Sequence, residues 1–432
     1  MKFENPPKMQ MSSELIDDYF DKKYSDFLKT SDDRYFYWDE LKHRKNLPYN
    51  DPIKAWSLVK LHRRSNYKRL KFGREEFNYC LTENIQESLH EFDLKLIVGL
   101  YKNPITPFHK AEYLKNSILE EAIASSQVEG AATTTKVAFE MLKSGRNPRN
   151  ESEQMIFNNL RSIKLITEEI DKSLDFTLII ELHKTMTAST SAEYCAGNFR
   201  NNQIYVQDHV DGEIAHTPPE SKYVKKYMDD LCDFANSDKP FIHPIIKASI
   251  IHFMIGYIHP FMDGNGRTAR ALFYWFLVKK DYSLIKNISI SRAILNSRIQ
   301  YDKAFLKTEN DANDITYFIN YSIKSLRVAF ESLIKYRDKK KKDIEQANLI
   351  SYKMMDKGLN KRQADLIGHL YTKENSKVNI SSYSKKHEVV RQTARKDLNE
   401  LINAGIIQED KDGRNVVFKI TSKEKVNNFL EQ

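Results

Sequence analysis

A segment of twelve residues, His259-Pro-Phe-Met-Asp-Gly-Asn-Gly-Arg-Thr-Ala-Arg270, contains most of the residue types that phosphate chemistry requires. His259 can exchange a proton near neutral pH. Asp263 offers the hard oxygen ligand that Mg²⁺ accepts while it keeps waters and phosphate oxygens in its other positions. Gly264 and Gly266 lack Cβ atoms, so their backbone N–H groups can approach an oxyanion closely. The segment therefore predicts a site for a phosphate-containing ligand.

Two arginines complete the segment. Arg267 and Arg270 are three residues apart, so on a helix they occupy neighbouring positions of one face and can hold a polyphosphate together. Each residue type also has commoner uses: a Gly-x-Gly is usually a turn, a lone His is usually structural, and His259 with Asp263 could be a metal pair on one helical turn. The combination of all these groups favours nucleotide chemistry.

The flanking sequence indicates that the segment joins two helices. Before it, from residue 244 to residue 258, one face carries side chains three or four apart, as a buried helix does, at Ile246, Ser249, Ile250, Phe253 and Tyr257. The apolar pattern resumes after the glycines, so a second helix is predicted to begin near Asn265. Its free amides and the positive end of its dipole would face the same anion.

The segment resembles the signature of the Fic family (filamentation induced by cAMP), His-Pro-Phe-x-Asp/Glu-Gly-Asn-Gly-Arg-x-x-Arg, at every specified position. The resemblance implies a mainly α protein, a Fic-fold helical bundle with a β-hairpin flap. It also implies transfer of AMP from ATP to a hydroxyl side chain of a target protein, with release of pyrophosphate. In that reaction His259 would deprotonate the target hydroxyl and Asp263 would hold Mg²⁺.

The same resemblance assigns the contacts to the nucleotide phosphates. Asn265 and the backbone around Gly264 and Gly266 would bind the α-phosphate, and Arg267 and Arg270 would hold the β- and γ-phosphates. The acceptor could be Ser, Thr or Tyr, on a target protein or on the chain itself. We expect ATP and Mg²⁺ to be required.

A second motif lies upstream, within residues 120–130. It is similar to the family's inhibitory helix, Ser/Thr-x-x-x-Glu-Gly/Asn, with Ser125, Glu129 and Gly130 at the matching positions. The resemblance implies that Glu129 engages Arg270 and so prevents it from holding the γ-phosphate, because a carboxylate there occupies the cation and repels an anion. Taken alone, this motif would fit a solvated Glu at a helix end with Gly130 as its terminator.

Two short extended segments, 203–206 and 214–219, are joined by the polar turn 208–212 and predict a β-hairpin. The hairpin is similar to the family's flap, which lies over the active site and can hold the target's backbone by strand addition. An ordinary surface hairpin is the alternative. The flap positions that could contact ligand are Ala215, His216 and Thr217.

Residues 290–302 resemble the helix that flanks the adenine in the family, where members often carry two adjacent tyrosines. This chain has Gln300-Tyr301, so Tyr301 is the predicted adenine contact. An aromatic side chain packed in the core is the alternative interpretation.

Length and composition set the remaining limits. The chain has 432 residues, a formal net charge of +9 and three cysteines without metal-ligand spacing, which favours a reducing, cytoplasmic compartment. The start of the chain does not resemble a signal peptide, and no run of about eighteen apolar residues predicts a membrane span. The positive charge suits acidic partners or nucleic acid.

Three regions are predicted. Residues 1–95 form a helical accessory region, 96–335 the Fic core with the inhibitory helix at about 111–130, and 345–432 a winged helix-turn-helix domain after the charge run 335–342. The last region shows helices over 360–371, 381–387 and 391–404 and a hairpin of 405–409 and 416–420 around the turn 410–415.

The residues that begin the third of these helices, Arg391 to Lys396, suit contact with bases and phosphates in a major groove, although such domains also bind proteins. Three alternatives to simple AMP transfer stay open. The enzyme could also remove AMP from a modified target, transfer UMP or another phosphate-containing group, or act as a DNA-binding regulator that only senses nucleotide. A homodimer is possible.

Overall fold

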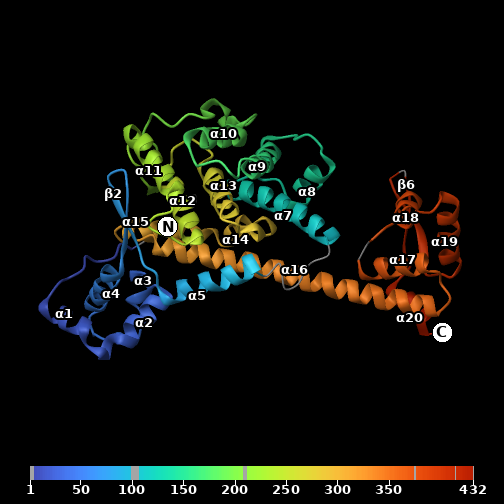
Figure 1. Ribbon diagram of the computed structural model, residues 1–432, viewed down its shortest axis with the longest axis horizontal. Helices are drawn as coiled ribbons and strands as arrows, with labels where there is room; N and C mark the ends of the chain where they lie inside the picture. The colour runs from blue at the N-terminus through green and yellow to red at the C-terminus, as the bar shows by residue number, and fades with distance from the viewer. Residues whose placement is uncertain (1–3, 99–106, 208–211, 374–375, 414, 432) are drawn as a thin grey trace. The chain divides into compact units, whose positions relative to one another are not determined.

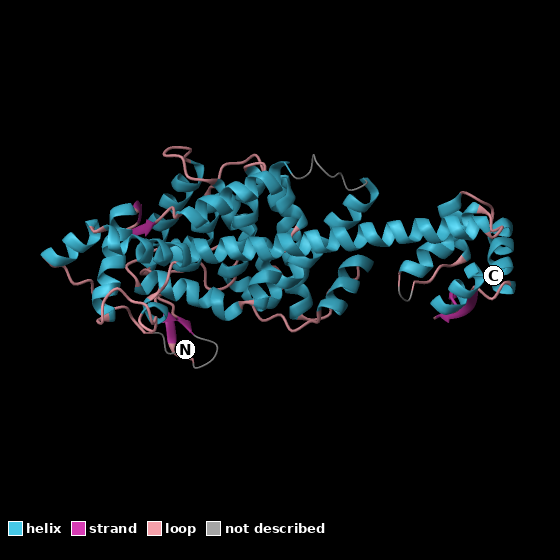
Figure 2. Cartoon of the chain, turned by 90° about the horizontal axis from the view of Figure 1, so that it is seen from below, coloured by secondary structure: helices cyan, strands magenta, loops and turns pink. Residues whose placement is uncertain are grey.

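The computed structural model describes residues 4–98, 107–207, 212–373, 376–413 and 415–431. The chain divides into unit 1, Met1–Glu331, and unit 2, Ser332–Gln432, with the boundary inside the long helix α16 (Thr316–Asp356). Helices dominate the described residues, whose strands form three two-stranded antiparallel sheets (Figures 1 and 2). The predicted mainly α class is confirmed. Within the predicted flap turn, residues 208–211 lie outside the described part of the chain.

The N-terminal part of unit 1 combines short helices with a β-hairpin. Its elements are α1 (Ser13–Phe20), η1 (Lys22–Tyr24), α2 (Ser25–Arg34), α3 (Trp38–Leu41), α4 (Pro52–Asn66), β1 (Lys68–Phe72), β2 (Glu75–Tyr79), α5 (Glu83–Phe92) and η2 (Asp93–Val98). The sequence predicts a helical region and does not reveal this hairpin. Gly73 turns it with a φ of +58°, and Phe72 and Phe77 are buried beneath it.

Buried polar contacts join this part to the loop between α15 (Arg298–Asn310) and α16. Lys60 Nζ lies 2.8 Å from a carboxylate oxygen of Asp311, and the Tyr35 and Tyr67 hydroxyls donate to Asp314 at 2.6 and 2.8 Å. Breaking a buried charge pair leaves an uncompensated charge, so these contacts tie the N-terminal elements firmly to the rest of unit 1.

The remaining elements of unit 1 carry the residues of interest. They are α7 (Pro107–Val128), α8 (Thr135–Ser144), α9 (Glu151–Glu168), α10 (Phe176–Thr187), η3 (Ser191–Cys195), β3 (Val206–Gln207), β4 (Ile214–His216), η4 (Ser221–Tyr223), α11 (Val224–Asn236), α12 (Pro244–Ile258), α13 (Asn265–Lys279), η5 (Ser283–Asn287) and α14 (Ile290–Asn296). As the apolar pattern predicts, α12 ends at Ile258 and α13 begins at Asn265. Both are buried on nearly all sides, as central helices are.

Unit 2 contains the end of α16, α17 (Lys361–Thr372), α18 (Ile380–His387), α19 (Arg391–Asn403), β5 (Ile407–Asp412), β6 (Asn415–Ile420) and α20 (Lys423–Glu431). Three helices and a hairpin follow the order that the sequence indicates, and α20 is an addition. The strands are longer than predicted, because the ladder continues through the polar residues to the pair Asp412 and Asn415. Ladder pairing uses backbone groups, so polar side chains do not end it. No described helix has the length and apolar character needed to cross a membrane.

Candidate active site

His259 stands at the end of α12 in an unusual backbone conformation. Its φ of +49° and ψ of +59° are left-handed, a region that non-glycine residues rarely adopt and that concentrates at functional sites. Its Nδ1 lies 3.2 Å from the carbonyl oxygen of Gly256. A carbonyl only accepts, so Nδ1 carries the proton and Nε2 keeps its lone pair. Burial lowers the pKa of His259 to about 4, which leaves the ring neutral at pH 7.

Arg200 holds the backbone around His259. Its own N–H donates to the Pro260 carbonyl at 2.8 Å, its Nε donates to the His259 carbonyl at 2.8 Å, and an Nη donates to the Ile258 carbonyl at 3.3 Å. The side chain is 3 % exposed. Three donors directed at consecutive carbonyls offset the cost of the left-handed residue and fix where the imidazole lies.

His183, on α10, supports the turn that follows. Its ring stacks on Phe261 at 3.7 Å between centroids, its Nε2 lies 2.8 Å from the Asp263 carbonyl oxygen, and its Nδ1 accepts the Gly197 N–H at 2.9 Å. Both ring nitrogens are therefore used, and burial lowers the pKa of His183. The Asp263 side chain is 52 % exposed, with Oδ1 3.3 Å from Arg267 Nη2.

The glycines form the predicted turn at the start of α13. Gly264 is the N-cap with a φ of +82°, so the free amides of the first turn follow directly. Asn265 is 2 % exposed, and its side chain accepts from the Phe261 N–H at 2.9 Å and donates to the Phe261 carbonyl at 2.8 Å. Its side chain thus holds the loop in shape, and its backbone amide belongs to the first turn of α13.

Arg267 is 2 % exposed. One Nη donates to the Met186 carbonyl at 3.2 Å and the other to Asp263. Its Nε finds no acceptor among the described residues. A buried guanidinium donor without a partner is costly, so this atom is where an anionic ligand would be most favourable.

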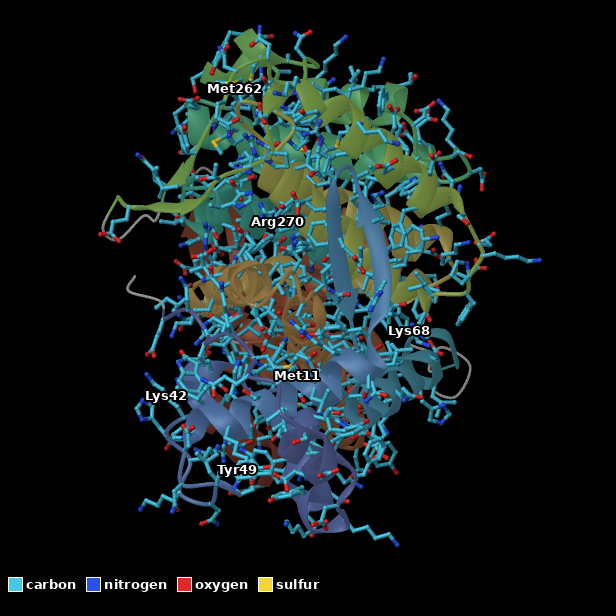
Figure 3. All side chains as sticks on the ribbon, turned by 90° about the vertical axis from the view of Figure 1, so that its left-hand side faces the viewer. Met11, Lys42, Tyr49, Lys68, Met262 and Arg270 are labelled. Atoms are coloured by element: carbon cyan, nitrogen blue, oxygen red, sulfur yellow. The ribbon has the colours of Figure 1, made fainter. Side chains whose placement is uncertain are left out.

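Arg270 lies one helical turn further and is 3 % exposed, well inside unit 1, whereas Met262 lies at the edge (Figure 3). Its Nε donates to the Ser125 hydroxyl at 2.9 Å and its Nη2 to the Ser125 carbonyl at 2.8 Å. Nη1 lies 3.0 Å from Glu129 Oε1, close enough for an ion pair, but it makes no aligned hydrogen bond within the described residues. One end of Arg270 is thus anchored and the other faces Glu129.

Glu129, just beyond the end of α7, places its carboxylate among cations. Burial works to raise its pKa, but the guanidinium groups of Arg270, Arg267 and Arg298 together hold the pKa below its usual value, so the group is charged at pH 7. A Cβ on Gly266 would lie 2.3 Å from Glu129 Oε1. The missing Cβ is what allows the carboxylate to reach the first turn of α13. Gly130, with a φ of +92°, lets the chain turn away after Glu129.

The structure also shows the surroundings of the predicted adenine contact, Tyr301, and of the predicted flap residues. Tyr301 is 7 % exposed, with its hydroxyl 2.9 Å from His252 Nε2 and its ring packed against Phe305 and Phe318, so the structure places it in an aromatic core. Such a ring offers little free face to an adenine.

On the flap strand β4, His216 makes two contacts, 2.6 Å to a Glu309 carboxylate oxygen and 2.7 Å to the Tyr257 carbonyl oxygen. Ala215 is partly buried and Thr217 is exposed. The hairpin of β3 and β4 is therefore held beside the end of α12, the helix that leads to His259.

The sequence did not reveal the supporting roles of three residues: His183 and Arg200, described above, and Glu121, whose contacts are given below. Each is a single polar residue within an apolar or mixed stretch and has no motif of its own. The only available signal was the Gly197–Arg200 stretch, which marks the approach to the flap without showing that Arg200 binds three consecutive carbonyls.

The fold and the site together define a helical protein in which a helix N-terminus and two buried arginines lie near a neutral, buried histidine. The Fic/DOC family profile matches residues 173–277, so the chain contains a Fic domain. That range includes the flap and the whole of His259–Arg270. It does not include α7, so the position of Glu129 comes from the structure alone.

Similar proteins carry the same domain. A protein adenylyltransferase Fic of Nematostella vectensis is 29 % identical over 206 residues, 46 % of each chain, and one of Drosophila willistoni is 33 % identical over 124 residues, 28 % of this chain and 23 % of that protein. The chain thus matches less than half the length of these relatives.

Two solved structures show the same fold. A Fic family protein from Desulfovibrio desulfuricans G20 superposes with a TM-score of 0.53 at 17 % identity, over 78 % of this chain and 96 % of that one. Fic-1 of C. elegans (residues 134–508) gives a TM-score of 0.51 at 18 % identity, over 75 % and 87 %.

Proposed function

We propose that the chain is a protein adenylyltransferase, which transfers AMP from ATP to a Ser, Thr or Tyr hydroxyl of a target protein. One observation carries this proposal: a neutral histidine whose Nε2 keeps its lone pair stands near a helix N-terminus with two buried arginines. Of these, Arg267 has an Nε without an acceptor in the described chain, and Arg270 has an Nη1 whose partner is the Glu129 carboxylate. The curated relatives named protein adenylyltransferase Fic support the choice of reaction.

The chemistry follows from the placement of these groups. The acceptor oxygen attacks the α-phosphorus of ATP and forms a new P–O bond while its proton passes to His259 Nε2. The bond between the α-phosphorus and the oxygen bridging to the β-phosphate breaks, and pyrophosphate leaves with that electron pair. The amides at the start of α13 stabilise charge on the α-phosphate, and Arg267 and Arg270 stabilise charge on the departing pyrophosphate.

Asp263 is the residue that would hold Mg²⁺. No cluster of three His, Cys, Asp or Glu side chains occurs among the described residues, but Mg²⁺ often takes only one or two protein carboxylates together with substrate phosphates. The half-exposed Asp263 carboxylate beside the phosphate cradle fits that mode. When bound, the ion would neutralise phosphate charge and hold the triphosphate in one geometry.

In this conformation Glu129 would restrain the reaction. Its carboxylate occupies Arg270 within the same chain and lies against Gly266, where phosphate oxygens must be accommodated. A nucleotide bound beside it would be displaced from in-line geometry, and phosphoryl-group transfer depends strongly on positioning.

Self-labelling with α-labelled ATP tests the proposal. We expect weak labelling of the wild type, strong labelling of Glu129→Gly and none of Glu129→Gly/His259→Ala. Parallel reactions with α-labelled UTP distinguish AMP transfer from UMP transfer. If Glu129→Gly labels neither itself nor any protein of a cell extract, while the protein is folded and binds ATP, the transferase proposal is wrong.

Removal of AMP is a second candidate, because the charged Glu129 carboxylate lies against Gly266, in the same segment as His259. In that reaction the carboxylate would orient a water for attack on the AMP phosphorus. Release of AMP from a purified labelled target that depends on Glu129 would support it.

The exposed residues of α19, Arg391, Gln392, Arg395 and Lys396, support a further proposal, that unit 2 binds DNA. Binding through phosphate contacts must weaken steeply as salt rises. Salt-independent retention of unit 2 by a protein partner would instead favour a protein-binding role.

A further inference from the structure

One face of helix α7 carries a polar side chain at every fourth position, at Ser117, Glu121 and Ser125, and the same spacing continues to Glu129 just beyond the end of the helix. The first three are only 7 %, 4 % and 2 % exposed. Burying a polar group costs free energy unless the group is hydrogen-bonded. Each buried polar side chain in this row therefore needs a hydrogen-bond partner on a neighbouring element.

Glu121 has the most extensive set of partners in this row. Its Oε2 accepts from the Tyr274 hydroxyl at 2.8 Å, from the Ser289 hydroxyl at 2.9 Å and from the Ser291 N–H at 3.0 Å, and its Oε1 accepts from the Ser291 hydroxyl. Burial raises the pKa of Glu121, although these donors oppose the shift. Four hydrogen bonds therefore fasten the middle of α7 to α13 and to the start of α14.

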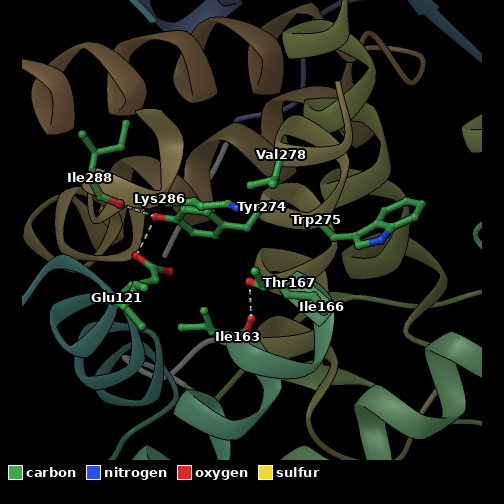
Figure 4. A pocket seen from close by; sticks show the side chains of 10 residues that line it. Glu121, Ile163, Ile166, Thr167, Tyr274, Trp275, Val278, Lys286 and Ile288 are labelled. Atoms are coloured by element: carbon green, nitrogen blue, oxygen red, sulfur yellow. Dashed lines mark hydrogen bonds between the residues drawn. The ribbon is translucent and has the colours of Figure 1, made fainter. Parts of the chain in front are cut away.

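The surroundings of Glu121 leave room for little besides these protein partners. Beside it lies a cavity of about 30 Å³, enclosed mainly by apolar side chains of α7, α9 and α13 and the chain before α14 (Figure 4). Figure 4 shows the Tyr274 hydroxyl between the Glu121 carboxylate and the Ile288 carbonyl. A space of this size can hold at most one or two waters, so α7 cannot shift here without breaking the hydrogen bonds.

The contacts of α7 with α13 run in opposite directions along the two helices. Glu121 meets Tyr274, Ser125 meets Arg270 four residues earlier on α13, and Glu129 meets Gly266 four residues earlier again. Each step of four residues moves about 6 Å along both helices. Anchoring α7 at Glu121 therefore sets how far Glu129 reaches along α13.

We propose that Glu121 is a positioning residue whose anchorage to Tyr274, Ser289 and Ser291 holds α7 in the register that brings Glu129 to Arg270. The proposal rests on the proposed function, in which Glu129 restrains AMP transfer. Glu121 itself lies two helical turns from Glu129 and touches no predicted ligand group. Loss of the anchor lets α7 move and releases Arg270 while the catalytic residues remain intact.

The test compares two neighbouring substitutions in the full chain, Glu121→Gln and Glu120→Gln. Glu120 is the matched control, because it loses the same charge but forms its ion pair with Arg292 at a site about 30 % exposed. We expect Glu121→Gln to raise self-labelling from α-labelled ATP by about fivefold or more, the lower end of common allosteric couplings, and Glu120→Gln to leave it near the wild-type level.

The same substitutions in a Glu129→Gly background separate positioning from simple loss of structure. There the restraint is already absent, so Glu121→Gln should give no further rise. A residue with only a structural role would lower labelling in both backgrounds. Tyr274→Phe removes one donor to Glu121 and keeps the ring, so it should raise labelling by less than Glu121→Gln does. If Glu121→Gln does not fold, Tyr274→Phe is the variant that tests the proposal.

Wild-type labelling by both folded Glu121→Gln and Tyr274→Phe would overturn the proposal. If folded, ATP-binding Glu129→Gly labels neither itself nor any protein of a cell extract, the transferase function is overturned instead. Hydrogen exchange of the α7 amides tests the role of Glu121 without an activity assay. Faster exchange in residues 116–128 of Glu121→Gln than of Glu120→Gln supports the proposal that Glu121 anchors α7, and equal exchange excludes it.

Discussion

Helices α13 and α7, which contact each other at Arg270, differ in how their buried polar groups are hydrogen-bonded. On α13, Arg267 and Arg270 are almost fully buried, yet Arg267 Nε has no acceptor among the described residues, and Arg270 Nη1 has the ion pair with Glu129 but no aligned hydrogen bond there. On α7, Glu121 is equally buried and accepts hydrogen bonds on both oxygens. The α13 segment has buried donors that lack an aligned hydrogen bond, and the α7 segment has a buried carboxylate that accepts hydrogen bonds on both oxygens.

The difference separates binding from positioning. An unpaired buried donor raises the free energy of the ligand-free protein, and an anion that supplies the acceptor lowers it, so the α13 donors favour phosphate binding. A fully paired buried carboxylate gains nothing from a ligand and instead makes movement costly. Glu129 stands between the two, a charged group that partly satisfies Arg270 without an aligned hydrogen bond.

The largest expected effect is on the catalytic side. In a Glu129→Gly background, His259→Ala should lower the initial rate of self-labelling by about a thousandfold, because general base catalysis contributes roughly 10²–10⁴-fold. His62→Ala is the matched control, since His62 pairs with Asp32 in the N-terminal region. Labelling by the His259→Ala protein at a tenth of the parent rate or more would exclude His259 as the base.

The next effect tests the α7 side. Glu129→Gly in the otherwise wild-type chain should raise the labelling rate by about ten- to a hundredfold, since small misplacements of a reacting group cost about 10²-fold. The affinity for ATP, measured by calorimetry, should also rise, because a carboxylate no longer repels the phosphates. Unchanged rate and affinity would show that the contact of Glu129 with Arg270 does not restrain the site.

A third substitution tests whether the Asn265 side chain binds ligand or stabilises the loop. This side chain makes two hydrogen bonds with the Phe261 backbone, so Asn265→Ala should lower the free energy of unfolding by about 1–3 kcal/mol, the cost of leaving a buried backbone group unpaired. Urea unfolding measures this loss. A large fall in labelling without any loss of stability would instead indicate that the Asn265 side chain contacts the α-phosphate.

The smallest expected change is in the pH dependence. Burial holds the pKa of His259 near 4, so the neutral, proton-accepting form persists as pH falls from 7.5 to 5.5. The labelling rate of Glu129→Gly should change by less than about twofold over that range, whereas an imidazole with an ordinary pKa near 6.5 would lose about tenfold. Removing Glu129 lowers this pKa slightly further, because its charge raises it. A tenfold loss by pH 5.5 would place the base in a solvated environment.

Much of the fold and of the local structure of the His259–Arg270 segment could be predicted from the sequence, because the relevant information is local. The helix before His259 and the helix that begins at Asn265 follow from apolar spacing, and the turn between them follows from glycines. The hairpin β1–β2 could not be predicted, because its short, charged strands lack a clear alternation and are stabilised by burial of Phe72 and Phe77 against distant residues.

Long-range contacts also explain the residues that sequence reasoning placed differently or missed. Tyr301 stands where an adenine contact is expected, but its neighbours His252 and Phe318 come from α12 and α16 and enclose it. His183 and Arg200 lie some 60 to 80 residues from the backbone groups they hold. No spacing rule connects residues that far apart along a chain.

The sequence by itself determined which groups lie together: a histidine, a carboxylate, a glycine turn and two cations in one short segment, all of which depend on residue type and local backbone freedom. Only the tertiary structure decided the state of that chemistry. Burial set His259 neutral, the packing of α7 on α13 brought Glu129 to Arg270, and Glu121 supplied the anchor. Desolvation and contact between distant helices depend on the packed chain, so no local pattern could have shown them.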